Sequence, residues 1–123
     1  MDMDALFFFD GKPEELALYE ALTEAMKPLG EITVTVFKTQ ISLRNRKVFA
    51  CVSMMRPLRR ALLPEHFIVL TLGLPYPLSS PRIAAVTEVR PRRFTHHIVL
   101  SSPAELDGEL MGWVREAWEF GQR

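Results

Sequence analysis

The sequence predicts a two-layer α+β sandwich, in which an antiparallel sheet of five to six strands is packed by an N-terminal and a C-terminal helix. Two observations support this class. Apolar residues recur at helical spacing near both ends of the chain, and they alternate with a period of two through the middle. Two amphipathic helices on one face of a sheet would bury both sets of apolar residues. The length of 123 residues fits a single domain over residues 1–123.

The first helix is expected over residues 10–29. Asp10 supplies a capping side chain, Pro13 suits a first helical turn, and the acids after it match the positive end of the helix dipole. Leucines and other apolar residues then recur at helical spacing, and Gly30 ends the helix after a proline.

The strands are expected in the middle of the chain. Residues 32–37 alternate and are β-branched or aromatic, and Asn45 marks a tight turn because asparagine tolerates a positive φ. Residues 47–54 are apolar on both faces, as a central strand requires. Residues 55–65 hold two prolines and three arginines, which predicts a loop or a short basic helical turn. Further strands are expected over residues 67–72, 82–89 and 94–100.

The second helix has a full capping box at its start, with Ser102 as the cap, Pro103 in the first position and Glu105 in the third. An apolar stripe through Phe120 follows. An alternative topology stays open at this point. If Leu6–Phe9 formed a first strand, the order would be that of helix-grip domains, in which a curved sheet grips the last helix around a cavity. That order would predict an internal ligand.

Composition narrows the class of protein without naming a function. Hydrophobic residues make up 48% and charged residues 24%, as in soluble globular proteins. The single cysteine excludes an intramolecular disulfide and a multi-cysteine zinc site, and it fits a reducing compartment. The N-terminal apolar run is too short for a signal peptide, and no stretch approaches the ~20 residues of a membrane span. We therefore expect a cytoplasmic protein with no membrane partner.

Charge is balanced overall but not along the chain. The 15 basic residues match the 15 acidic ones, yet residues 1–37 carry −6, residues 38–93 carry +9 and residues 94–123 carry −3. The basic middle could form an anion site, or it could neutralise the acidic helices across the two layers. Nucleic acid is not an expected partner, because the basic residues are not interleaved with aromatic ones and the sequence pI is 6.8.

One strand stretch has the pattern of a binding strip. Lys38, Gln40, Ser42 and Arg44 alternate onto one face, opposite apolar residues. Four polar side chains in a row could bind an anionic or carbonyl-bearing ligand. The same pattern is also typical of a solvated edge strand, where charged residues prevent edge-to-edge pairing.

The adjacent His96 and His97 lie in a predicted strand, so their rings point to opposite faces and cannot chelate one metal ion together. His96 shares the apolar face, where it could be an acid–base group in a pocket or a histidine bonded at the edge of the core. A metal site would need His66 with carboxylates from elsewhere, and no pattern supplies them. Cys51 lies between apolar neighbours, as an inert core cysteine does.

The sequence holds none of the common catalytic or nucleotide-binding motifs. It has no GxSxG elbow, no GxGxxG loop and no GxxxxGK[ST] loop. We therefore predict no catalytic residue, no cofactor and no metal ligand set.

Several short motifs, taken in order, resemble a family of uncharacterised bacterial domains, the domain-of-unknown-function family 5655. More distantly, the chain is similar to YdhG-like domains. The motifs span nearly the whole chain and are residues 9–14, 38–42, 49–52, 72–74, 93–97 and the terminal helix. The resemblance implies a compact α+β domain in bacteria, and it brings no activity, substrate or catalytic residue.

The leading hypothesis is a non-enzymatic binding module for a small anionic or polar ligand, or for an acidic protein segment. Its expected lining is Lys38, Gln40, Ser42, Arg44, Arg93, His96 and His97. A second hypothesis is a small enzyme with His96 as the acid–base group in a helix-grip cavity. A third is a self-associating interaction module, a homodimer in which the acidic helices of one copy dock on the basic sheet of the other.

Overall fold

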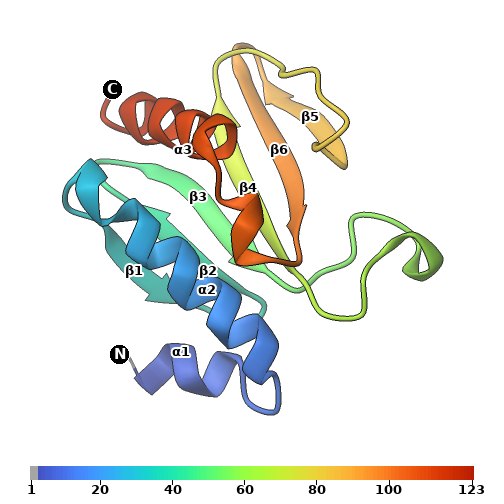
Figure 1. The fold of residues 1–123 in the computed structure, drawn as a ribbon. Helices are drawn as coiled ribbons and strands as arrows, with labels where there is room; N and C mark the ends of the chain where they lie inside the picture. Colours follow the sequence, from blue (N-terminus) through green and yellow to red (C-terminus); the bar gives the residue numbers. More distant parts are fainter. Residues whose placement is uncertain (1–2) are drawn as a thin grey trace.

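The computed structural model describes residues 3–123 and confirms the predicted fold class (Figure 1). One sheet contains all six strands in the order β1-β2-β3-β4-β6-β5, and every neighbouring pair is antiparallel. The strands are β1 (Thr33–Val36), β2 (Gln40–Arg44), β3 (Val48–Ser53), β4 (Ile68–Leu74), β5 (Ala85–Arg90) and β6 (Arg93–Leu100). The helices are α1 (Met3–Phe8), α2 (Pro13–Met26) and α3 (Gly108–Gly121), with short 3-10 turns η1 (Lys27–Leu29), η2 (Arg60–Leu62) and η3 (Pro103–Glu105).

The core lies between the sheet and its two longer helices, α2 and α3, which cover the same face (Figure 1). The apolar stripes predicted for both helices supply buried side chains, including Leu22 of α2 and Val114 of α3. Alternate residues of the central strands meet them, such as Leu70 of β4 and Ile98 of β6. The face opposite α2 and α3 is called the open face below. No helix of the described residues 3–123 has the length and apolarity needed to cross a membrane.

The N-terminal segment overturns the first strand of the helix-grip alternative. Residues 3–8 form α1, and the ring of Phe9 is buried against Tyr19 of α2, with ring centroids 5.3 Å apart. Asp10 does not cap α2. The cap position belongs to Lys12, whose side chain makes no capping hydrogen bond, and Pro13 starts the helix. The chain turns at residues 9–12, and this turn buries the ring of Phe9 in the core. The segment therefore does not pair as a strand, which is why the helix-grip order is wrong.

The predicted capping box forms, but it caps η3 instead of a long helix. Ser102 accepts a hydrogen bond from Ala104, and Glu105 bonds back to the Ser102 amide. The chain then leaves the helical region, and α3 begins anew with Asp107 as its cap, which accepts from the Leu110 amide.

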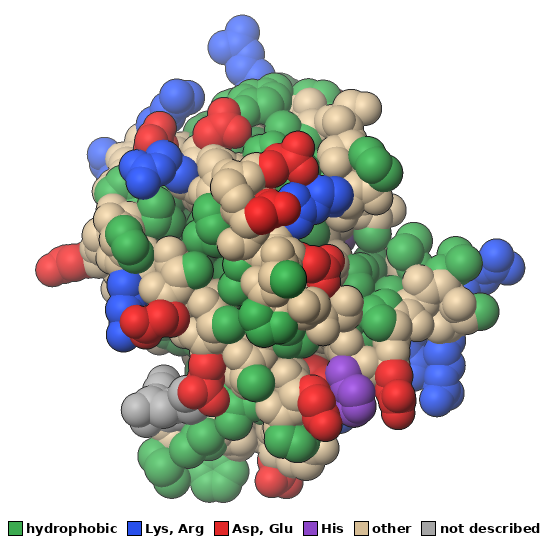
Figure 2. Space-filling view, in the orientation of Figure 1, with side chains coloured by type: hydrophobic (Ala, Val, Ile, Leu, Met, Phe, Trp, Pro, Cys, Tyr) green, Lys and Arg blue, Asp and Glu red, His purple; other side chains and the backbone are tan. Residues whose placement is uncertain are grey.

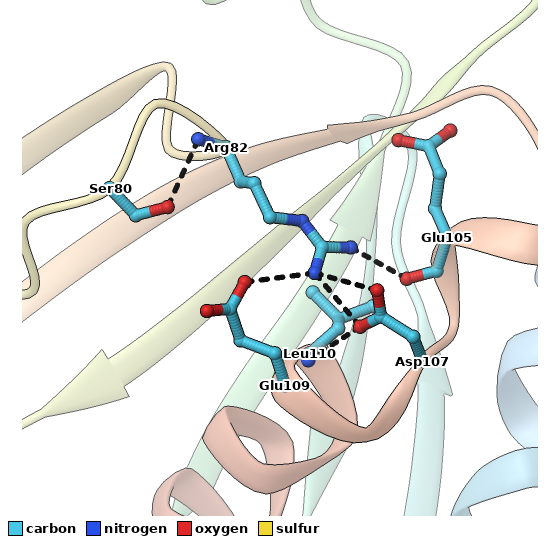
Figure 3. A network of polar contacts seen from close by, with 6 residues as sticks. All are labelled: Ser80, Arg82, Glu105, Asp107, Glu109 and Leu110. Carbon is cyan, nitrogen blue, oxygen red and sulfur yellow. Dashed lines mark hydrogen bonds and ion pairs between the residues drawn. The ribbon is translucent and has the colours of Figure 1, made fainter.

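Arg82 gives the physical reason for this break (Figure 3). Its Nη2 donates to the backbone carbonyl of Glu105 at 2.7 Å. In a longer helix this carbonyl would instead accept from a backbone amide of the next turn. Its Nη1 donates to both carboxylate oxygens of Asp107, at 2.8 and 3.1 Å, and to Glu109 at 3.1 Å. Arg82 thereby ties the segment before β5 to the start of α3.

Candidate functional site: a polar cleft on the open face

The strand register aligns one row of side chains across the open face. In β2, β3, β4 and β6 the member lies next to a buried residue of the core, so the alternation along these strands points the row away from α2 and α3. This cross-sheet row consists of Thr35, Ser42, Cys51, Thr71, His97 and Ala85, in the order of the strands. Because Cys51, Thr71 and His97 are at least 20 positions apart in sequence, only the sheet order brings these three residues together.

A cleft of about 470 Å³ lies over the middle of the cross-sheet row. Cys51, Thr71 and His97 contribute to it from the central strands, and Gln40, Ser53 and Val69 come from the neighbouring positions. Met55, Arg56 and Pro57, which follow β3, form a further part of its lining. Polar atoms therefore alternate with small apolar surfaces in one concave site.

His97 is held by a neighbouring strand. Its Nδ1 lies 2.8 Å from the hydroxyl of Thr71, the residue opposite it in the register. Burial lowers the pKa of the His97 imidazole below its ordinary value of 6.5, so the ring is neutral at neutral pH. A neutral ring bonded at Nδ1 keeps Nε2 for another partner, and Nε2 has no hydrogen-bond partner among residues 3–123.

Cys51 lies on the open face, not in the core where the sequence placed it. The residue is half-buried, and its Sγ lies 3.9 Å from the hydroxyl of Ser42. Burial raises the pKa of the Cys51 thiol, and the Ser42 contact only partly opposes this effect. The thiol is therefore protonated at neutral pH, which does not suit a nucleophile.

The structure brings together part of the predicted binding strip. Gln40 and His97 line the cleft, and Ser42 lies beside it in the cross-sheet row. Arg44 ends β2 next to a bulge, where its guanidinium donates to the Arg46 carbonyl at 3.4 Å. Lys38 lies in the β1–β2 turn, outside both strands, and it is exposed.

His96 and Arg93 lie elsewhere. His96 is fully buried on the helix side, where Nδ1 donates to the Leu72 carbonyl at 3.3 Å and Nε2 accepts from the Leu78 amide at 3.0 Å. Burial lowers the pKa of the His96 ring as well. Both nitrogens are thus used by the backbone, as in a histidine bonded within the core. The guanidinium of Arg93 lies 5.0 Å from the ring centroid of Phe120 in α3.

A second cluster escaped the sequence-based reasoning. Among the described residues 3–123, Glu14, Glu15 and His66 place one potential metal-ligating atom each within 4.8 Å of one another. Glu15 and His66 are 51 positions apart, so no local spacing could reveal the pair. The only available signal was the isolated His66 after an acid in the basic segment.

An open antiparallel sheet with both longer helices on one face and a polar cleft on the other defines a small two-layer α+β domain. Residues 7–121 match the family model described as "Domain of unknown function (DUF5655)", and the chain belongs to this family. No curated protein and no solved structure matches the chain. The similarity to YdhG-like domains and a bacterial origin stay predictions.

Proposed function

We propose that the domain is a non-enzymatic binding module whose open-face cleft takes a small anionic or carbonyl-bearing ligand. The observation that carries this proposal is the cleft itself, where the ring of His97 and the guanidinium-bearing Arg56 share one concavity of about 470 Å³. This volume lies in the range of small-molecule sites. The described lining includes no Asp or Glu, so an anion would meet no carboxylate there.

The polar groups of the cleft suit oxygen acceptors. Arg56 has no ion-pair partner among residues 3–123, which leaves its guanidinium for a carboxylate or phosphate. The Gln40 amide and the hydroxyl of Ser53 supply neutral donors. If the Thr71 hydroxyl donates to His97 Nδ1, the ring presents a donor at Nε2 as well.

The apolar part of the lining would bind the carbon skeleton of such a ligand. Val69 is buried at the floor, and Met55, Pro57 and Ala85 lie around it. A ligand with one charged end and a short apolar body would therefore match both parts of the surface better than a bare ion would.

Native mass spectrometry of freshly purified protein, followed by denaturation of the same sample, tests for a carried ligand. We expect an extra mass that is lost on denaturation. NMR titrations with succinate and with inorganic phosphate then test the class of ligand, and we expect shifts at the Thr71 and His97 amides. A dimer in the native spectrum would favour self-association instead.

Two variants locate the site. Arg56→Gln should weaken binding of the effective probe about tenfold, because a hydrogen bond to a charged group is lost. Arg59→Gln is the matched control, since Arg59 is an exposed arginine of the same loop that does not line the cleft. Equal weakening by both variants, or shifts confined to the helix face, would refute the proposed site.

A further inference from the structure

We propose that Glu14, Glu15 and His66 form a binding site for a divalent transition-metal ion such as Zn²⁺. None of the three lines the open-face cleft, so this proposal does not rest on the function proposed above, although Arg56 borders both the cleft and the cavity beside Glu15. The inference starts from two observations: three ligand atoms converge from two distant segments, and one of the carboxylates is buried with an unpartnered oxygen.

The fold brings the three side chains together at the N-terminal end of α2. Pro13 opens the helix, so both glutamates lie in its first turn, and His66 is the second residue before β4. Successive helical side chains diverge by about 100°, yet both acids reach the same ring nitrogen. His66 Nδ1 lies 3.2 Å from Glu15 Oε2 and 3.8 Å from Glu14 Oε2. Figure 2 shows a histidine flanked by acidic side chains beside this end of α2.

The burial of Glu15 is the independent sign of a missing partner. This residue is only 4% exposed. Its Oε2 accepts from His66 and from the Phe67 amide at 3.2 Å, whereas its Oε1 is buried with no hydrogen-bond partner in the described part of the chain. A buried carboxylate oxygen without a partner is costly, and a bound cation would supply that partner. Glu15 also borders a cavity of about 460 Å³, which Glu14 and His66 do not line, so the site rests on the convergence of the three side chains and on the unpartnered oxygen.

The donor set selects the class of ion. Two carboxylates and one imidazole offer oxygen and nitrogen ligands, which suit Zn²⁺ and similar divalent ions, and three protein ligands leave a position for water. On the far side of the ring, Nε2 lies 3.9 Å from Glu65 Oε1. This separation is longer than the hydrogen bond by which a carboxylate orients a metal-binding imidazole, so Glu65 contributes only negative charge beside the site. Without metal, a proton on Nδ1 can occupy the place between the ring and the two acids.

Basic side chains limit the affinity of this site. Lys12, Arg56 and Arg60 line the same cavity as Glu15. Their charges oppose a free cation, and the carboxylates of Glu14, Glu15 and Glu65 offset them. We therefore expect weaker binding than at a structural zinc site.

Isothermal titration calorimetry of the full chain with ZnCl₂ tests the proposal. We expect one ion per chain. Glu14→Gln and His66→Gln should each raise the Kd at least about tenfold, since each removes one ligand. Both side chains are about half exposed, so both variants should fold, which a thermal melt checks. Glu20→Gln, an exposed acid further along α2, is the matched control and should leave the Kd unchanged.

The alternatives are separable in the same experiment. Zinc binding that persists in His66→Gln but disappears in a Cys51→Ser or His97→Asn variant would assign the ion to the open face and overturn this site. Absence of binding at millimolar zinc would overturn it as well. X-ray absorption of the zinc-loaded protein should show a single imidazole among oxygen ligands, and a sulfur ligand would contradict the assignment.

Discussion

The backbone amide of Leu78 donates a 3.0 Å hydrogen bond to Nε2 of the buried His96. The other nitrogen of the ring bonds the Leu72 carbonyl of β4, so one side chain attaches residues 75–81 to the sheet. Three prolines in that segment lack a donor and cannot pair with a strand. Only the neutral imidazole donates at one nitrogen and accepts at the other. The ring therefore takes the place of regular backbone pairing.

The first prediction concerns pH. Burial lowers the pKa of both His96 and His97 below the ordinary 6.5, so the folded chain binds fewer protons than the unfolded chain does. The stabilisation is fully present above pH 6.5 and is lost as pH falls toward the folded-state values. We expect the free energy of unfolding in urea to decrease from pH 7.5 to pH 5. Equal stability at the two values would contradict this linkage.

Replacing the buried ring tests its role directly. His96→Leu should lower the free energy of unfolding by about 2–4 kcal/mol, because the Leu78 amide and the Leu72 carbonyl lose their partner. The variant should also show a weaker pH dependence between pH 7.5 and pH 5. His97→Leu, at the adjacent and only half-buried position, should lower the free energy of unfolding by a smaller amount. Denaturant melts of both variants at the two pH values give the comparison.

The end of α3 approaches the β2–β3 turn too closely for a side chain. A Cβ on Gly121 would lie 2.6 Å from Asn45 Oδ1 and 2.9 Å from Phe49 Cβ, and Asn45 also donates to the Trp118 carbonyl. Gly121→Ala should therefore destabilise the protein by about 1–3 kcal/mol. The control is Gly112→Ala in the same helix, where a Cβ meets open space. Thermal melts should show stabilisation of about 0.5–1 kcal/mol there.

The contacts of Arg82 predict a local effect at the start of α3. Arg82→Ala removes its bonds to Asp107, Glu109 and the Glu105 carbonyl, and the side chain is largely covered. We expect a loss of about 1 kcal/mol, since ion pairs of this kind are partly screened by solvent. Hydrogen exchange should become faster at the first amides of α3. Arg115→Ala, an exposed arginine of that helix, should leave these rates unchanged.

Cys51 should react slowly with iodoacetamide at pH 8. Burial raises its pKa, so less thiolate is present at a given pH than for a free cysteine. The same chain denatured in guanidinium chloride provides the reference rate. Ser42→Ala should slow the reaction further, because the Ser42 contact favours the thiolate. A folded chain that reacts as fast as the denatured one would refute this assignment.

The local patterns predicted the elements well where one face of each element is buried. Three patterns in the sequence follow this burial directly: the alternation around Val34, the apolar run around Val52 and the stripe ending at Phe120. The structure has β1, β3 and α3 at these places. The predicted start of α3 was wrong because the Arg82 guanidinium donates a hydrogen bond to the Glu105 carbonyl, and these two residues are 23 positions apart. A capping box predicts only the helical turn that it starts, and it does not predict how far the helix continues.

The candidate site was predicted in part for a similar reason. The alternation of Gln40 and Ser42 correctly gave a polar strand face opposite Ile41 and Leu43, because side-chain direction in a strand depends only on the period of two. It could not show that His97 lies on that face beside Thr71, because this depends on the order of strands in the sheet.

The sequence by itself determined the α+β class, the two layers and which face of each helix and strand is apolar, because these follow from spacing along the chain. The tertiary structure alone decided which polar residues meet. Strand order placed Cys51, Thr71 and His97 in one row, and the packing of α2 beside the β3–β4 loop placed Glu15 against His66. Such contacts join segments that are far apart in the sequence, and no local periodicity relates one segment to the other. Only the folded chain therefore shows which of these residues meet.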